Sequence, residues 1–290
     1  RAKRIRCFLS SKRNAPSMSI APLDIAVIVV VYNKLHPACL TSLKRVVELS
    51  PLSIEVVVVD NASPNLDVAT MTHEAYPKAH LIVCRKNHGF GRACNRGARV
   101  LNASYLFFLN PDTFLTNDTL FDTLHGFMKR YPKVGMTAPR THYLDGTLQE
   151  TCRRFPAWHM PLVRRTALAS RTRGQQYVND FLMKDFDHAS ARMVDWVQGS
   201  AMMIETALYG DMGGFDERYF MYFEDVDLCR QCWERGRPVY YLPSTTIAHE
   251  YTQGSAKVAG PVSGIFTNRL ARAHVHSWLR YLSKWGTRTL

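Results

Sequence analysis

The 290-residue chain is predicted to be an α/β protein built on a mostly parallel, Rossmann-like central sheet. Two observations predict this fold class. Strand-like and helix-compatible stretches alternate through the first half of the chain. The strand-like runs are nearly continuous Val, Ile, Leu and Phe, as expected when helices cover both faces of a sheet. Because open sheets of this type bind ligands beyond the carboxyl ends of their strands, polar residues there are the first site candidates.

The individual elements follow from the same patterns. The expected strands lie at 24–32, 54–61, 80–86, 105–110, 193–204 and 239–242. The expected helices lie at 36–49, 64–75, 90–102, 117–130, 224–235 and 264–285, with short helical turns at 205–211. The stretch 140–192 is irregular and rich in arginine, which predicts a mobile insertion over the site.

The net charge of +13 is concentrated in two tails. Residues 1–23 and 251–290 each hold six Lys or Arg and no acid, which leaves 25 basic residues against 24 acids in the body. Such tails suit anionic lipid or nucleic acid. No apolar run approaches the roughly 20 residues that span a bilayer, and the basic start is not typical of a secretory signal. Residues 1–17 are expected to be vector-derived or a poorly ordered extension.

Seven scattered cysteines indicate a reduced, cytosolic protein. Cys229-x-x-Cys232 alone has the spacing of half a zinc site or of a redox pair. No second pair of this spacing exists, and this one lies within a helical pattern. Ordinary reduced cysteines are therefore the favoured interpretation.

Polar clusters follow three of the expected strands, at Tyr32-Asn33, at Asp60–Ser63 and at Asn110–Asp112. A carboxylate such as Asp112 at a sheet edge can hold Mg²⁺ or Mn²⁺, although an Asp after Pro is also common turn chemistry. Asp60 can accept a hydrogen bond from a nucleobase. Its segment also has the pattern of a helix start, with Ser63 as N-cap, which would leave Asp60 free.

Asn87–Gly97 forms a glycine-bearing turn between an expected strand and helix. Glycines permit close backbone approach and a helix N-terminus favours anions, so a phosphate or sugar contact is one interpretation. A purely structural turn is the other. The segment lacks both the Walker sequence and the dinucleotide GxGxxG spacing.

The segment 213–228 combines aromatic residues with carboxylates, and Glu224, Asp225 and Asp227 open the expected helix there. Acids at a helix start favour the helix dipole, which is the structural explanation. A general base beside a surface that stacks a sugar is the functional one. His249 is a lone histidine that is either structural or, as a neutral imidazole, completes a metal shell with Asp112.

Together these motifs resemble the inverting family 2 glycosyltransferases of GT-A fold, in particular the bacterial rhamnosyltransferases. The resemblance covers about residues 24–250 and follows the family's order and spacing. It rests on Val30-Val-Tyr-Asn33, Val58-Val-Asp-Asn-Ala-Ser63, Asn87-x-Gly-Phe-Gly-x-Ala-x-Asn-x-Gly97, Asn110-Pro-Asp112, Gly199-Ser-Ala-Met202, Gly213-Gly-Phe-Asp-Glu217, Phe223-Glu-Asp-x-Asp-Leu228 and His249.

The resemblance implies a role for each matching position. Asp225 would be the catalytic base that deprotonates the acceptor hydroxyl, and Asp112 would bind the divalent ion with help from His249. The nucleotide-sugar would be held by Tyr32, Asn33, Asp60, Asn87, Gly89, Phe90, Gly91, Asn95 and Asn110. Gly199, Ser200, Phe223 and Glu224 would contact the donor or acceptor sugar. One departure concerns the metal, because Asn110 replaces the first acid of the family's usual Asp-x-Asp. An Asn still offers an oxygen, so the affinity for Mg²⁺ or Mn²⁺ is left open.

The resemblance also implies substrates. We expect transfer of L-rhamnose from dTDP-L-rhamnose to a lipid-linked acceptor or to a cell-surface polysaccharide such as O-antigen. A UDP-sugar donor, for galactofuranosyl or hexosyl transfer, is the alternative.

The expected organisation is a basic N-terminal extension (1–23), a GT-A catalytic domain (24–250) and a basic amphipathic C-terminal extension (251–290). Within the catalytic domain, 24–112 would be the nucleotide-sugar half and 113–250 the acceptor half. The C-terminal helix either lies on an anionic membrane, as a cytoplasmic protein peripheral on the inner face would require, or docks on the catalytic domain. The sequence does not predict the oligomeric state.

Two other classes of protein compete with this interpretation. A nucleic-acid-binding protein is suggested by the tails, but it would interleave aromatic with basic residues, whereas these aromatics gather with acids. We therefore expect no nucleic-acid partner. A nucleotidyltransferase would carry a Gly-rich, Lys-bearing loop after the first strand, and Tyr32–Leu35 lacks the glycines.

Overall fold

The computed structural model describes residues 22–160, 172–250 and 268–287. The expectations for residues 1–17 lie outside these residues, as do those for residues 251–267, the part of the expected C-terminal extension that precedes its helix.

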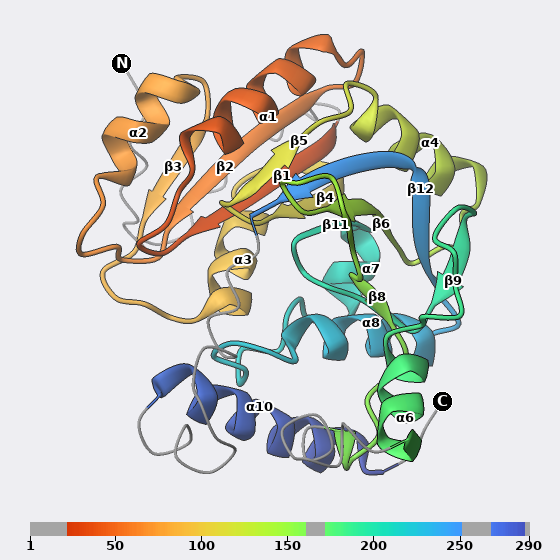
Figure 1. The fold of residues 1–290 in the computed structure, drawn as a ribbon. Helices are drawn as coiled ribbons and strands as arrows, with labels where there is room; N and C mark the ends of the chain where they lie inside the picture. The colour runs from red at the N-terminus through yellow and green to blue at the C-terminus, as the bar shows by residue number, and fades with distance from the viewer. Residues whose placement is uncertain (1–21, 161–171, 251–267, 288–290) are drawn as a thin grey trace.

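A single large mixed sheet forms the centre of the molecule (Figure 1). Its strand order is β3 (His80–Val83), β2 (Ile54–Asp60), β1 (Leu23–Val31), β4 (Ala103–Leu109), β11 (Ala201–Glu205), β6 (Met136–His142), β12 (Val239–His249) and β5 (Thr113–Leu115). The first four strands are parallel, β11 runs antiparallel between β4 and β6, and β12 is parallel to β6. The predicted mostly parallel α/β sheet is confirmed.

Helices cover both faces of the sheet, as the apolar strands require (Figure 1). One hydrophobic core lies under α1 (Pro37–Leu49), α2 (Val68–Ala75) and α4 (Leu120–Arg130). The other lies under α3 (Phe90–Ala98), α7 (Thr206–Asp211) and α8 (Glu224–Glu234). The predicted C-terminal helix is present as α10 (Arg269–Trp285), and its Tyr281 is buried in this second core.

Several of the predicted elements have different bounds, among them the strand expected at 239–242, which extends to His249. The helix expected at 64–75 begins at Val68, because Asp67 rather than Ser63 caps it, accepting a hydrogen bond from Thr70 N at 3.0 Å. The strand expected at 193–204 is divided into β9 (Arg192–Val194), β10 (Trp196–Val197) and β11. A turn at Gly199–Ser200 separates the last two and, as shown below, belongs to the site.

The stretch 140–192 is more ordered than its composition predicts. Its described parts contain β7 (Leu148–Gln149), β8 (Cys152–Arg153) and α6 (Thr172–Phe181). Phe155, Phe181 and Phe186 are buried in the second core, and the Trp196 indole donates to the Arg154 carbonyl at 2.8 Å. The prediction of a mobile insertion is therefore wrong for residues 140–160 and 172–192.

The six cysteines in the described parts of the chain are all free and buried. Cys229 and Cys232 lie on the inner face of α8, fully covered, and burial raises the pKa of the Cys232 thiol to about 12. A thiol held in its neutral form binds zinc poorly and is a poor nucleophile. Both thiols are free, as the interpretation of ordinary reduced cysteines predicts, and the structure adds that they are buried.

Candidate active site

Asp112 and His249 come together at the carboxyl-end edge of the sheet, although 137 residues separate them. The turn after β4 carries Asp112 and leads into β5, and the antiparallel pairing of β5 with β12 sets His249 opposite Thr113. His249 Nε2 lies 3.1 Å from Asp112 Oδ1. Both side chains are largely buried, with 2% of the His249 side chain and 13% of the Asp112 side chain exposed.

Lys34 and Gln149 complete the surroundings of this pair. Lys34 Nζ donates to Asp112 Oδ2 at 3.0 Å, and the Gln149 side-chain oxygen lies 2.8 Å from His249 Nδ1. Burial opposes the ionisation of Asp112, but the hydrogen bonds and charges of His249 and Lys34 outweigh it. The pKa of Asp112 is therefore lowered, and the group is a carboxylate at neutral pH.

The arrangement of Asp112 and His249 fits a divalent cation. The Gln149 side-chain oxygen can accept a hydrogen bond from Nδ1–H, which fixes the orientation of the His249 ring. Nε2 then faces Asp112 Oδ1 at hydrogen-bonding distance, and its lone pair would be available to a divalent ion held beside that oxygen. Two ligands at right angles around an ion at about 2.1 Å lie about 3 Å apart, close to the separation found here.

Asp225 lies in the first turn of α8, where backbone N–H groups rather than an ammonium group bind its carboxylate. Its Oδ2 accepts a hydrogen bond from Gly199 N at 3.0 Å, and its Oδ1 accepts one from Val226 N at 2.9 Å. The two residues before α8, Tyr222 and Phe223, have left-handed backbones with φ of 69° and 66°. Such strained conformations persist only when the surroundings hold them.

Glu224 is buried beside Asp225, and its Oε2 has no hydrogen-bond partner in the described residues. Burial raises the pKa of both carboxyls, and the nearby charge of Asp225 raises that of Glu224 further. Arg153, whose guanidinium lies 5.0 Å from the centre of the Trp196 ring, acts in the opposite direction on Asp225. Sequence analysis did not single out Arg153 from the other arginines of its stretch.

The turn at Gly199–Ser200 links the two carboxylate centres. Ser200 O accepts a hydrogen bond from Asn110 N at 2.9 Å, while Gly199 N binds Asp225. A Cβ atom at Gly199 would lie 3.5 Å from the Asp225 Cβ and 3.1 Å from Met202 Cε. The turn thus fixes the Asp225 carboxylate against the segment that carries Asp112.

The expected nucleotide edge is formed where β1 and β2 end side by side. Asn33, with φ of 54°, donates its N–H to Ser63 Oγ at 3.0 Å and accepts from Asn65 N at 3.2 Å. Asp60 Oδ1 accepts from Ser63 N at 2.9 Å, so the expectation that Asp60 is free of the turn is wrong. Tyr32 is 41% exposed at this edge.

The glycine-bearing turn before α3 is packed against protein. Asn87 Oδ1 accepts from Gly89 N at 2.8 Å, and Phe90 N donates to Phe220 O at 3.0 Å. A Cβ atom at Gly89 would collide with the Phe220 carbonyl, and one at Gly91 would lie 2.9 Å from the Phe215 Cβ. Close approach of the 213–223 loop therefore accounts for both glycines.

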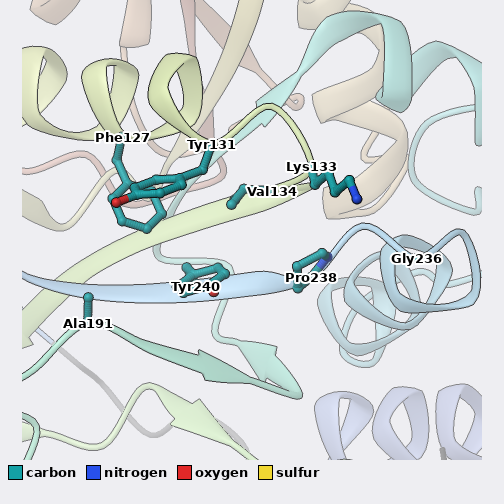
Figure 2. Close-up of a pocket in the computed structure, with 8 residues that line it drawn as sticks. All are labelled: Phe127, Tyr131, Lys133, Val134, Ala191, Gly236, Pro238 and Tyr240. Atoms are coloured by element: carbon teal, nitrogen blue, oxygen red, sulfur yellow. The ribbon is translucent and has the colours of Figure 1, made fainter.

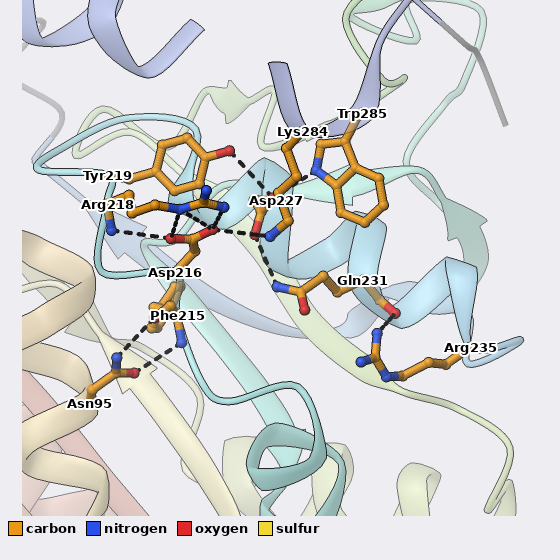
Figure 3. A network of polar contacts seen from close by, with 10 residues as sticks. All are labelled: Asn95, Phe215, Asp216, Arg218, Tyr219, Asp227, Gln231, Arg235, Lys284 and Trp285. Carbon is orange, nitrogen blue, oxygen red and sulfur yellow. Dashed lines mark hydrogen bonds and ion pairs between the residues drawn. The ribbon is translucent and has the colours of Figure 1, made fainter. Parts of the chain in front are cut away.

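Asn95 holds the same loop from within α3 (Figure 3). Its amide donates to Phe215 O and accepts from Phe215 N, each at 2.9 Å, and the residue is 3% exposed. Both ends of the amide are occupied by this backbone, so Asn95 positions the loop that leads to Asp225.

Asp227, the third acid of the cluster, has a structural task. Its fully buried carboxylate accepts hydrogen bonds from Lys284 Nζ at 2.8 Å, Trp285 Nε1 at 2.7 Å and Gln231 Nε2 at 2.9 Å (Figure 3). It therefore anchors α10 to α8. Ser277 of α10 also donates to the Met221 carbonyl at 2.8 Å, which ties the helix to the 213–223 loop.

The docking of α10 confirms the second of the two expectations for this helix. The sequence pattern is compatible with Tyr281 and Trp285 facing a membrane, but in the structure these side chains face the protein. The exposed face of α10 includes Arg269, Arg272, His276 and Leu279. No helix among the described residues is long and apolar enough to cross a membrane.

A cavity of about 590 Å³ lies elsewhere, walled by Phe127, Tyr131 and Tyr240 (Figure 2). It sits near the amino ends of β6 and β12, whereas His249 closes the carboxyl end of β12. This cavity is therefore separate from the Asp112 and Asp225 centre.

With this geometry established, comparison with known proteins identifies the family. The family model for glycosyl transferase family 2 matches residues 26–192, more than half of the chain. The chain belongs to the family 2 glycosyltransferases.

The curated relatives include rhamnosyltransferases. The N-acetylglucosaminyl-diphospho-decaprenol L-rhamnosyltransferase of Mycobacterium tuberculosis (strain H37Rv) is 26% identical over 218 residues, covering 70% of this chain and 69% of the relative. The rhamnosyltransferase WbbL of Escherichia coli K12 is 26% identical over 187 residues, covering 64% of each chain.

Solved structures support the fold. GalNAc-T7, crystallised with UDP, GalNAc and Mn²⁺, superposes with a TM-score of 0.65 at 15% identity, over 91% of this chain and 48% of that one. TarS of S. aureus superposes with a TM-score of 0.53 at 16% identity, over 80% of this chain and 37% of that one. The chain thus spans less than half the length of either of these two structures. The predicted GT-A fold with a C-terminal helix is confirmed.

Proposed function

We propose that this protein is an inverting glycosyltransferase that moves L-rhamnose from dTDP-L-rhamnose to a hydroxyl of a lipid-linked or polysaccharide acceptor. The rhamnosyltransferases among its relatives support the donor, and a UDP-sugar is the alternative. The observation that carries the proposal is the Gly199–Ser200 turn, which joins the Asp112 segment to Asp225. Residues 24–112 would then bind the donor, and residues 113–250 would receive the acceptor.

Asp112 and His249 would hold a divalent ion, Mg²⁺ or Mn²⁺. Such an ion, when bound, offsets the charge that develops on the departing diphosphate. The Gln149 side chain fixes the imidazole so that Nε2 faces Asp112. No cluster of three or more His, Cys, Asp or Glu in the described parts of the chain could hold a metal alone, so the donor phosphates would supply further ligands.

Asp225 would act as the general base. Its two backbone hydrogen bonds fix the carboxylate, and its raised pKa makes it a stronger base than an exposed Asp. The acceptor hydroxyl loses its proton to Asp225 as its oxygen bonds to the anomeric carbon. The bond from that carbon to the diphosphate oxygen breaks on the opposite face, so the configuration inverts. The buried Glu224 carboxyl and the Phe223 ring would border the sugar.

The nucleotide edge would bind the base and the phosphates. Asp60 keeps one carboxylate oxygen beyond its bond to Ser63, and the exposed Tyr32 ring is available to stack on a base. Asn110 lies in the same turn as Asp112 and would border the diphosphate. Asn87, Gly89, Phe90, Gly91 and Asn95 would act by positioning the 213–223 loop.

A donor panel tests the assignment. Purified protein with Mn²⁺ is incubated with dTDP-rhamnose, UDP-galactose, UDP-galactofuranose and a GDP-sugar, and thermal shift and donor hydrolysis are measured. We expect the thermal shift to be largest, and donor hydrolysis to be fastest, with dTDP-rhamnose. A response confined to UDP-sugars would replace rhamnose with the alternative donor, and NMR of the anomeric proton of the product would test inversion.

We also propose that the exposed basic face of α10 lies on an anionic membrane, with the protein peripheral on its cytoplasmic side. Each basic residue near such a surface contributes about 1 kcal/mol. Sedimentation with phosphatidylglycerol liposomes would compare the wild type with the R272A/L279A variant on α10 and with K129A/R130A on α4. We expect only the α10 variant to bind more weakly. Equal sedimentation of all three proteins would count against this role.

A further inference from the structure

We propose that Lys34 is a built-in cation of the diphosphate site, which binds the donor's diphosphate and competes with the divalent ion for Asp112. This inference rests on the proposed function and assigns a role to a residue to which the sequence motifs gave none. Lys34 follows Asn33 directly after β1, at the same sheet edge as Asp112.

The ammonium group lies at a junction of three strand ends. Lys34 Nζ is 3.0 Å from Asp112 Oδ2 and 3.2 Å from Glu250 Oε2, so residues that follow β1, β4 and β12 meet there. A backbone hydrogen bond of 2.9 Å from Glu250 N to Asp112 O holds the two acids in place. Asp112 therefore offers one oxygen to His249 and the other to Lys34.

Lys34 is also accessible and charged. Its side chain is 37% exposed, so the ammonium can reach a ligand at this sheet edge without unfolding any element. A lysine ammonium is a cation throughout the neutral range.

The charge of the site makes such a cation useful. Asn110 is neutral where an Asp-x-Asp motif has its first acid, so the site has one negative charge fewer with which to attract a metal. Asp112, Glu250 and Lys34 together carry a single net negative charge. The Lys34 ammonium would then neutralise part of the charge of a diphosphate, and a divalent ion would neutralise the rest.

A merely structural Lys34 would behave differently. An ion pair that only secures the loop after β1 contributes little and leaves nucleotide binding unchanged when it is removed. A competing cation has two opposite effects when removed. Binding of a nucleoside diphosphate without metal weakens, and binding of the metal without nucleotide strengthens.

The experiment measures these two equilibria separately in the full chain. Calorimetry with dTDP and UDP in EDTA gives metal-free nucleotide binding, and electron paramagnetic resonance of Mn²⁺ gives metal binding without nucleotide. The proteins are the wild type, K34M, K34R and the control K78M, which removes a lysine from the exposed turn before β3. Matching melting temperatures establish that K34M is folded.

For K34M we expect about tenfold weaker nucleotide binding in EDTA and severalfold tighter Mn²⁺ binding. K34R should keep most of the nucleotide affinity, and K78M should match the wild type. Unchanged nucleotide affinity in K34M, or weaker Mn²⁺ binding, would overturn the inference while leaving the proposed function intact. A wild type that binds no nucleoside diphosphate with or without Mn²⁺ would overturn both.

Discussion

Asp112 and Asp225 lie on either side of the Gly199–Ser200 turn, yet their surroundings shift their proton affinities in opposite directions. Asp112 faces the Lys34 ammonium and the His249 ring, and its pKa is lowered. Asp225 is held by backbone N–H groups beside the buried Glu224, and its pKa is raised. A carboxylate that stays ionised suits a cation, whereas one with greater proton affinity suits a base.

The largest expected effect comes from removing the base. Asp225→Asn keeps the side-chain shape and one of the two backbone hydrogen bonds, but the amide takes no proton from the acceptor. We expect transfer to fall by about 10³-fold while dTDP affinity stays within about twofold. Transfer kinetics and calorimetry measure the two quantities, with Asp211→Asn on the exposed end of α7 as the matched control. Near-normal turnover in the Asp225 variant would remove the base from this position.

Removing the other carboxylate should give a different profile. Asp112→Asn deletes the charged ligand while His249 remains, so Mn²⁺ binding should weaken about tenfold or more and transfer should fall about 10²-fold. Titration with Mn²⁺ at increasing concentration separates the two variants, because activity of the Asp112 variant should recover in part and that of the Asp225 variant should not. If the Asp112 variant bound Mn²⁺ as tightly as the wild type, the assignment of Asp112 to metal binding would be wrong.

The anchor of α10 should show the next largest effect. Lys284→Met leaves the fully buried Asp227 carboxylate without its ammonium partner, and loss of one partner from a buried pair costs about 3 kcal/mol. Urea unfolding should detect this loss in the free energy of unfolding. The control is Lys133→Met, a lysine on the surface before β6. A Lys284 variant as stable as the wild type would mean that Asp227 finds other donors.

Replacing Glu224 should have the smallest effect, and near pH 8 it should stabilise the folded protein rather than destabilise it. Its folded-state pKa is raised above the unfolded value, so its contribution favours folding at low pH and is lost as the pH rises through the folded-state pKa. Glu224→Gln removes this dependence, so we expect it to be at least as stable as the wild type at pH 8. The stability difference should shrink or reverse at pH 5. Melting temperatures across this range provide the measurement, and a variant less stable at pH 8 would contradict the sign.

The first half of the sheet could be predicted from the sequence because its information is local. Continuous apolar runs mark β1, β2, β3 and β4, and these positions are confirmed. The pairing of Asp112 with His249 is only one of two alternatives for a lone histidine until the resemblance of the motifs favours it. Their approach depends on how β5 and β12 align, which no local pattern encodes.

The contacts that sequence analysis missed are all long-range. Lys34 lies 78 residues from Asp112, and Gln149 lies 100 residues from His249, so neither partner is visible from spacing. The assignment of Asp227 to a catalytic cluster had the same weakness. Its partners are on a helix whose inward face cannot be told from a membrane-facing one by composition alone.

The anchoring of α8 by the last helix has a consequence for the order of events during biosynthesis. Lys284 and Trp285 are added to the growing chain 57 and 58 residues after Asp227. At roughly 5–20 residues per second, these partners are synthesised about 3 to 12 s after Asp227. The edge formed by β1, β2 and the turn after β4, where we propose that the donor binds, is therefore synthesised well before the helix that anchors α8.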